Sequence, residues 1–203
     1  MQDSKSRTNS PPKLIDLMRP APQNNSELKY AFPSGMHNDA LIAVEAFPAN
    51  PYRWSTFNVR VNNETVSIPY RVYHNPASIR TNKNSSLQKN LVGCILSRNH
   101  DGFVRQEYLT QIVVSNYPWV PPFVIQLLGE YVVEILRVIE ANLGNLDKAL
   151  YTQFLRANPD FLALTGQRVI SYWDCYYRFS CRKEDYPGFR AIHFFKQLVK
   201  DED

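Results

Sequence analysis

The 203-residue sequence has few glycines, few cysteines and no dense run of basic residues. Its seven glycines form no GxSxG, P-loop or GxGxxG motif, which counts against a nucleotide-binding enzyme. The three cysteines are scattered and form no CxxC pair, so they indicate neither a disulfide framework nor a zinc site. A formal net charge of +4 without a basic block counts against nucleic acid as the partner.

The sequence also lacks the patterns that direct a chain to a membrane or to a metal. Its first 20 residues are polar and rich in proline, so they do not have the apolar core of a signal peptide. The four histidines show no HxH or HExxH spacing, and no metal or cofactor is expected. With three cysteines expected to be reduced, these features predict a cytoplasmic protein that does not enter a membrane.

The pattern of apolar residues predicts a mainly α protein made of one domain and a tail. Residues 1–30 are polar with four prolines, which predicts a mobile N-terminal tail. Residues 31–203 are expected to form a single globular domain. Within it we predict a small β-hairpin at 56–73 and a helical body at 85–200, a bundle of about six helices. The segment 119–143 is expected to supply its central helix.

The hairpin prediction rests on strict alternation of apolar and polar residues. Phe57, Val59 and Val61 alternate with polar residues, and the alternation resumes at Val66 and Ile68 after an asparagine-rich break. Alternation with a period of two on both sides of a turn is typical of a hairpin with one face on the core. The apolar segment that precedes the hairpin fits either the end of a short helix or a third strand.

Two phrases of the helical body resemble the helix openings of HEAT-type repeats. They are HDGFVRQEYL at 100–109 and PWVPPFV at 118–124. The resemblance implies helices stacked as pairs, at intervals of roughly 40 to 47 residues. It covers about forty residues and has no second Val-Arg copy, so an ordinary helical bundle is the preferred fold.

Two carboxylates interrupt the apolar central segment. Glu130 and Glu134 are four residues apart, a spacing that places both on one face of a continuous helix. If that face lined a cleft, the pair could act in acid–base catalysis. The same stripe could instead be a solvated face, with Arg137 neutralising Glu134. A third interpretation pairs the buried carboxylates with Arg105 or Arg168.

The segment 168–183 is the part of the chain richest in aromatic and basic residues together. Core packing is one interpretation, in which Trp173 and Tyr177 pack inward with Ile170. Arginines interleaved with tyrosines also suit a protein interface or single-stranded nucleic acid. The candidate binding residues are Trp119, Arg168, Tyr172, Trp173, Tyr176, Arg178 and Arg182.

Of three functional hypotheses, a non-enzymatic protein-binding or adaptor module is preferred. The alternatives are an enzyme with Glu130 and Glu134 in a helical cleft and a nucleic-acid binder that uses 168–183. The adaptor hypothesis expects Trp119→Ala or Tyr176→Ala to abolish binding of a protein partner while the chain stays folded.

Overall fold

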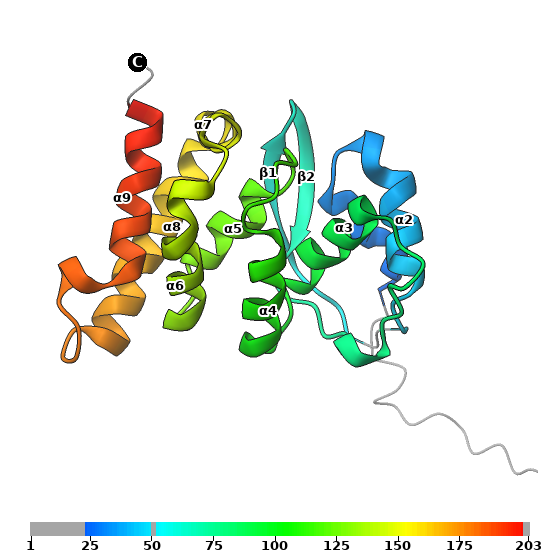
Figure 1. Cartoon of the computed structure of the whole chain (residues 1–203), viewed down its shortest axis with the longest axis horizontal. Helices are drawn as coiled ribbons and strands as arrows, with labels where there is room; N and C mark the ends of the chain where they lie inside the picture. Colours follow the sequence, from blue (N-terminus) through cyan, green and yellow to red (C-terminus); the bar gives the residue numbers. More distant parts are fainter. Residues whose placement is uncertain (1–22, 50–51, 201–203) are drawn as a thin grey trace, which may run out of the picture.

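The computed structural model describes residues 23–49 and 52–200, which form an elongated, mainly helical molecule with one small sheet. The N-terminal elements lie at one end and helix α9 at the other (Figure 1). This architecture confirms the predicted mainly α fold with a small hairpin ahead of the helical body. No helix within the described ranges is both long and apolar enough to cross a membrane.

The N-terminal end consists of three short helical elements. They are the 3-10 helices η1 (Asn25–Ala31) and η2 (Ser34–Met36) and the α-helix α2 (His37–Glu45). Residues 25–30 were predicted to be tail, but they belong to η1, where Leu28 is buried in the core. The rest of the predicted tail, residues 1–22, lies outside the described residues. The ambiguous apolar segment before the hairpin belongs to a helix and not to a strand.

The predicted hairpin is present as two antiparallel strands, β1 (Thr56–Val61) and β2 (Glu64–Pro69). Burial alternates along β1 as the sequence predicts. Asn62 and Asn63 connect the strands with φ angles of 49° and 64°, the left-handed conformation that a tight type I′ hairpin turn requires. The second strand ends at Pro69, before the predicted limit of residue 73, and one further backbone hydrogen bond joins the Tyr70 N–H to the Ser55 carbonyl at 2.8 Å.

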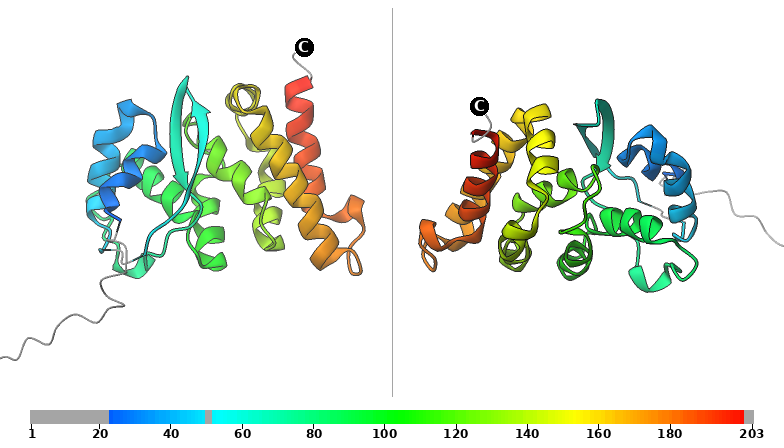
Figure 2. Two further views of the ribbon diagram at one scale, coloured as in Figure 1. Left: turned by 180° about the vertical axis from the view of Figure 1, so that it is seen from behind. Right: turned by 45° about the horizontal axis from the view of Figure 1, so that its top comes forward.

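The outer edge of β1 is covered by the helical body. The side chain of Asn158 accepts a hydrogen bond from the Arg60 N–H at 2.8 Å and donates one to the Arg60 carbonyl at 2.9 Å. Asn158 therefore takes the place of a neighbouring strand, which protects an otherwise open sheet edge. Both views of Figure 2 show the hairpin standing between the N-terminal elements and the C-terminal helices.

The helical body contains seven α-helices and several single turns among the described residues. The α-helices are α3 (Ser86–Leu96), α4 (Gly102–Ile112), α5 (Pro121–Leu128), α6 (Val133–Asn142), α7 (Lys148–Ala157), α8 (Pro159–Tyr172) and α9 (Pro187–Lys200). The N-cap residues Ser85, Asp101 and Asp147 each accept a hydrogen bond from the first turn of their helix. These polar side chains satisfy backbone donors that have no partner within the helix.

The predicted single central helix is wrong, because the chain forms two helices there. Helix α5 is buried on all sides, as its apolar composition predicts. It ends at Leu128, and α6 begins only at Val133. The four intervening residues turn the chain, so that Glu130 is buried whereas Glu134 is exposed.

His74 makes the stability of this fold depend on pH. Its Nε2 atom lies 2.9 Å from the Asn25 side-chain oxygen, and burial lowers the pKa of the ring from its ordinary 6.5 to about 4. The unfolded chain therefore binds a proton between these values while the folded chain does not, so stability is full above pH 6.5 and falls below it. We expect urea denaturation to show a loss of about 2 kcal/mol between pH 7 and pH 5 from this group.

Two variants isolate the contribution of His74. His74→Gln should remove most of this pH-dependent loss, because glutamine does not titrate. His193 is exposed, so His193→Gln should keep the full loss. Equal pH dependence in the two variants would contradict the assignment to His74.

Candidate functional site

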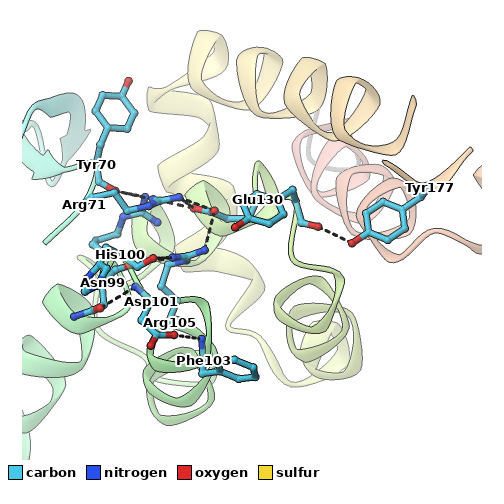
Figure 3. Close-up of polar contacts among 11 residues, drawn as sticks. Tyr70, Arg71, Asn99, His100, Asp101, Phe103, Arg105, Glu130 and Tyr177 are labelled. Atoms are coloured by element: carbon cyan, nitrogen blue, oxygen red, sulfur yellow. Dashed lines mark hydrogen bonds and ion pairs between the residues drawn. The ribbon is translucent and has the colours of Figure 1, made fainter. Parts of the chain in front are cut away.

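Glu130 is buried at the centre of a cluster of arginines. Arg71 Nη2 lies 2.7 Å from both carboxylate oxygens, Arg105 Nη2 lies 3.4 Å from Oε2, and Arg98 Nη2 lies 3.7 Å from Oε1. Figure 3 shows Arg71 and Arg105 reaching the carboxylate from different sides. The arginines come from the segment after β2, the end of α3 and the body of α4. The Glu130 carboxylate therefore links the segment after α5 to the three segments that carry the arginines.

Two of these arginines are almost completely withdrawn from solvent. Arg98 donates to the carbonyls of Pro69 and Tyr70, and Arg105 donates to the carbonyls of Asn99 and His100. Burial lowers the pKa of Arg98 to about 9, and the charge of Glu130 opposes this shift. Burial lowers the pKa of Arg105 as well. Glu130 is thus the counter-ion that makes two buried guanidinium groups tolerable.

The break between α5 and α6 follows from this cluster. If the helix continued through Glu130, the carboxylate would leave the arginines and join the outer stripe with Glu134. Gly129 permits the break to pack closely, because a Cβ there would lie 2.9 Å from Arg168 Cδ. The Tyr131 carbonyl, freed by the break, accepts a hydrogen bond from the Tyr177 hydroxyl at 2.7 Å (Figure 3). The ion cluster and this hydrogen bond offset the lost helical bonds.

The same break builds an exposed group of three tyrosines, which we call the tyrosine surface: Tyr131, Tyr172 and Tyr176. Tyr131 follows directly after Glu130, and the other two come from the end of α8 and the turn after it. The three ring centroids lie 6.0 to 6.2 Å apart. Tyr131 is 51% exposed and Tyr176 is 63% exposed. Large amphipathic rings gathered on a surface are typical of a binding interface.

A π-helical turn shapes one side of the tyrosine surface. Helix α8 ends at Tyr172 and is followed by a π turn at Trp173–Tyr177, in which the Arg178 N–H donates to the Trp173 carbonyl at 2.9 Å. The wider turn brings Tyr176 beside Tyr131 and also lets Tyr177 reach the Tyr131 carbonyl. Turns of this type are rare and are found frequently at functional sites.

The other predicted binding residues of 168–183 have different surroundings. Trp173 is half-buried, donates its indole N–H to the Cys181 carbonyl and packs edge-on against Phe189. This is the predicted core packing, whereas Ile170 is exposed, contrary to that prediction. Arg178 pairs with Asp174 at 3.1 Å, and Arg182 is exposed. The structure therefore brings only Arg168, Tyr172 and Tyr176 of this segment to the tyrosine surface.

Trp119 is a core residue, which corrects its prediction as a binding residue. It is only 5% exposed, and its indole N–H donates to the Asn90 side chain at 3.0 Å. The ring stacks on Tyr117 and packs edge-on against Phe32. Trp119 lies two residues before Pro121, which begins a helix that is buried throughout.

Glu130 and Glu134 do not share a helix face. Glu130 is 3% exposed and held by arginines, whereas Glu134 lies in the first turn of α6 and is exposed. The predicted geometry of a carboxylate pair in a cleft is therefore wrong. The alternative pairing of a buried carboxylate with Arg105 is confirmed for Glu130.

Other reactive groups of the described residues are dispersed. Cys94 is buried, and burial raises its pKa well above the ordinary value, so it is the inert core thiol that its helical position predicts. No group of three or more His, Cys, Asp and Glu residues within 23–49 and 52–200 is arranged to hold a metal ion. The arginine cluster and the tyrosine surface are thus the notable polar arrangements of this part of the chain.

Sequence reasoning missed three residues of the site: Tyr131, Arg71 and Arg98. Tyr131 was assigned to the interior of a helix, and Arg71 was taken as a hairpin residue. A signal for the arginines was present, because a glutamate in an apolar run requires cationic partners if it is buried. Such partners cannot be selected from the sequence when they lie 59 residues away, as Arg71 does.

Comparisons of the chain with known protein families, with curated proteins and with solved structures found no match. The HEAT-like pairing of helices therefore stays a prediction. The function has to be inferred from the geometry of the tyrosine surface and the arginine cluster alone.

Proposed function

We propose that this chain is a non-enzymatic protein-binding module and that the tyrosine surface is its binding site. The observation that carries the proposal is the meeting of three tyrosines, two of them more than half exposed, at a break in the central helices. Tyrosine and arginine dominate the binding energy of protein interfaces. The three free cysteines support a reducing compartment such as the cytoplasm as the place of action.

The residues of the tyrosine surface are held in fixed positions, which favours binding there. The backbone under Tyr131 is held by the Tyr177 hydroxyl on one side and by the buried Glu130 on the other. Tyr172 stacks on Tyr176 with ring centroids 6.1 Å apart. Side chains that are already ordered lose little conformational entropy when a partner binds.

The charges near the tyrosines support a protein partner over single-stranded nucleic acid. Nucleic acid requires a groove of accessible cations along its phosphates. Arg98 and Arg105 are buried, Arg71 is occupied by Glu130, and Arg178 by Asp174. These four arginines are therefore not free to follow a phosphate backbone, whereas exposed tyrosines suit the apolar centre of a protein interface.

Tyr176→Ala tests the proposal. We expect a loss of at least about 2 kcal/mol of binding free energy, roughly a thirtyfold weaker complex, because a central interface tyrosine is removed. Thermal stability should change by no more than about 0.5 kcal/mol, since the side chain is largely exposed. The measurement is quantitative capture of partners from nuclease-treated lysate by immobilised protein, with variants compared by mass spectrometry.

Phe179→Ala is the matched control. Phe179 is 91% exposed and lies in the same segment, and its ring packs against the Arg178 guanidinium, 4.6 Å away. The Phe179→Ala variant should capture the same proteins as the unchanged chain. Equal capture by both variants would contradict the proposal, and partners that disappear with nuclease treatment would favour the nucleic-acid alternative.

A further inference from the structure

Arg168 is a charged residue without a counter-ion. Among the described residues it forms no ion pair and no hydrogen bond, and its guanidinium carbon lies 5.9 Å from the centre of the Tyr70 ring. Its aliphatic part packs on Gly129 at the break between α5 and α6. It is partly exposed and lies one helical turn before Tyr172, so the two residues share one face of α8.

The surroundings of Arg168 carry an excess of positive charge. Arg71, Arg98 and Arg105 share the single carboxylate of Glu130. Arg98 Nη1 and Arg105 Nε are buried and have no hydrogen-bond partner. Asp101 also acts on Arg105, but its carboxylate is engaged as the N-cap of α4.

This imbalance is unfavourable for the isolated chain. The positive charges of Arg71, Arg105 and Arg168 all oppose protonation of Arg98. Like charges held together in a partly buried region repel each other, and an added anion relieves that repulsion. The cluster is therefore complementary to a negatively charged ligand that reaches it from the side of Arg168.

We infer that Arg168 is the anchor for a carboxylate of an acidic segment of the protein partner. This inference rests on the proposed function, because the carboxylate would arrive as part of a chain that covers the tyrosines. A planar guanidinium binds a carboxylate through two parallel hydrogen bonds. Arg71, with a side chain 31% exposed, adds charge beside it, and Tyr131 and Tyr172 offer apolar contact to a neighbouring side chain of the partner.

Peptides of defined sequence test this inference directly. The probes are fluorescein-labelled Glu-Glu-Phe-Glu-Glu and its counterpart Gln-Gln-Phe-Gln-Gln, and binding is followed by fluorescence anisotropy at low ionic strength. We expect the full chain to bind the acidic peptide at least about tenfold more tightly, the effect of a charge-assisted hydrogen bond. Arg168→Gln should abolish that preference.

Two further variants separate anion binding from a general effect. Arg178→Gln removes a partly exposed arginine of the same segment that is paired with Asp174, and it should keep the full preference. Arg168→Lys keeps the charge but loses the planar fork, so it should retain part of the preference. Retention by lysine and loss by glutamine, with unchanged thermal unfolding, would support binding through the charge of Arg168.

Several results would overturn the inference. These are equal binding of the two peptides, an equal effect of the Arg168→Gln and Arg178→Gln variants, or much stronger competition by inorganic phosphate than by acetate. The last result would indicate a phosphate ligand in place of a carboxylate. If Tyr176→Ala loses the cellular partner while Arg168→Gln leaves peptide binding unchanged, this inference fails and the proposed function stands. If Arg168→Gln weakens peptide binding but Tyr176→Ala still captures the cellular partner, the proposed function fails.

Discussion

Glu130→Gln is expected to destabilise the chain by about 3–5 kcal/mol. This is the usual cost of removing one partner of a buried ion pair, because the other charge stays buried without compensation. Glutamine keeps the size of the side chain but removes the charge that three arginines share. Arg98 and Arg105 would then be buried cations without the carboxylate that both of them share. Urea denaturation at neutral pH measures the effect as a lower midpoint with an unchanged slope.

Glu134→Gln is the control for this prediction. It makes the same chemical change four residues further along the chain, at an exposed position, and should alter stability by no more than about 0.5 kcal/mol. A mild effect at both positions would contradict the structural role of Glu130.

Trp119→Ala should cost about 3–5 kcal/mol, the usual loss when a buried aromatic residue is truncated. The ring is enclosed by Tyr117, Phe32 and the core, and its N–H has a buried acceptor in Asn90. Truncation would leave a cavity and remove the hydrogen bond. Thermal or urea denaturation measures this loss, which opposes the sequence-based expectation of a folded variant that only loses its partner.

An exposed aromatic residue provides the comparison for Trp119. Phe103 is 85% exposed at the start of α4, so Phe103→Ala should change stability by no more than about 0.5 kcal/mol. If Trp119→Ala were as stable as Phe103→Ala, the packing described for Trp119 would be contradicted.

The parts of the fold that were predictable from sequence depend on local interactions. Ser85 and Asp101 cap helices because their side chains reach donors only two or three residues away. The hairpin was predictable because alternation and an Asn-Asn turn act within a dozen residues. In such cases neighbouring residues determine the backbone, and distant parts of the chain need not be known.

The break between α5 and α6 could not be predicted from local preference. Residues 123–139 have the apolar composition of a continuous helix, and Gly129 alone is tolerated inside helices. The break is stabilised by Arg71, which lies 59 residues earlier in the chain, and by Arg168, which packs on Gly129. Ion pairing between distant parts of the chain thus overrides the local preference for a helix. The spacing of apolar residues along the sequence does not show this.

The tyrosine surface was predictable only in part, for the same reason. Tyr172 and Tyr176 are four residues apart, so a shared face follows from helical spacing. Tyr131 joins them only because the break turns it outward beside the buried Glu130. The tyrosine surface is therefore a product of the ion cluster, and the two features should be lost together.

The central claim is that a protein partner contacts the tyrosine surface, and site-specific photo-crosslinking tests it most directly. A photoreactive phenylalanine derivative would replace Tyr176 in the full chain in cells, and Phe179 in a parallel experiment. We predict a discrete protein adduct from position 176 that is absent from position 179. The same adduct from both positions, or adducts from position 179 alone, would contradict the claim.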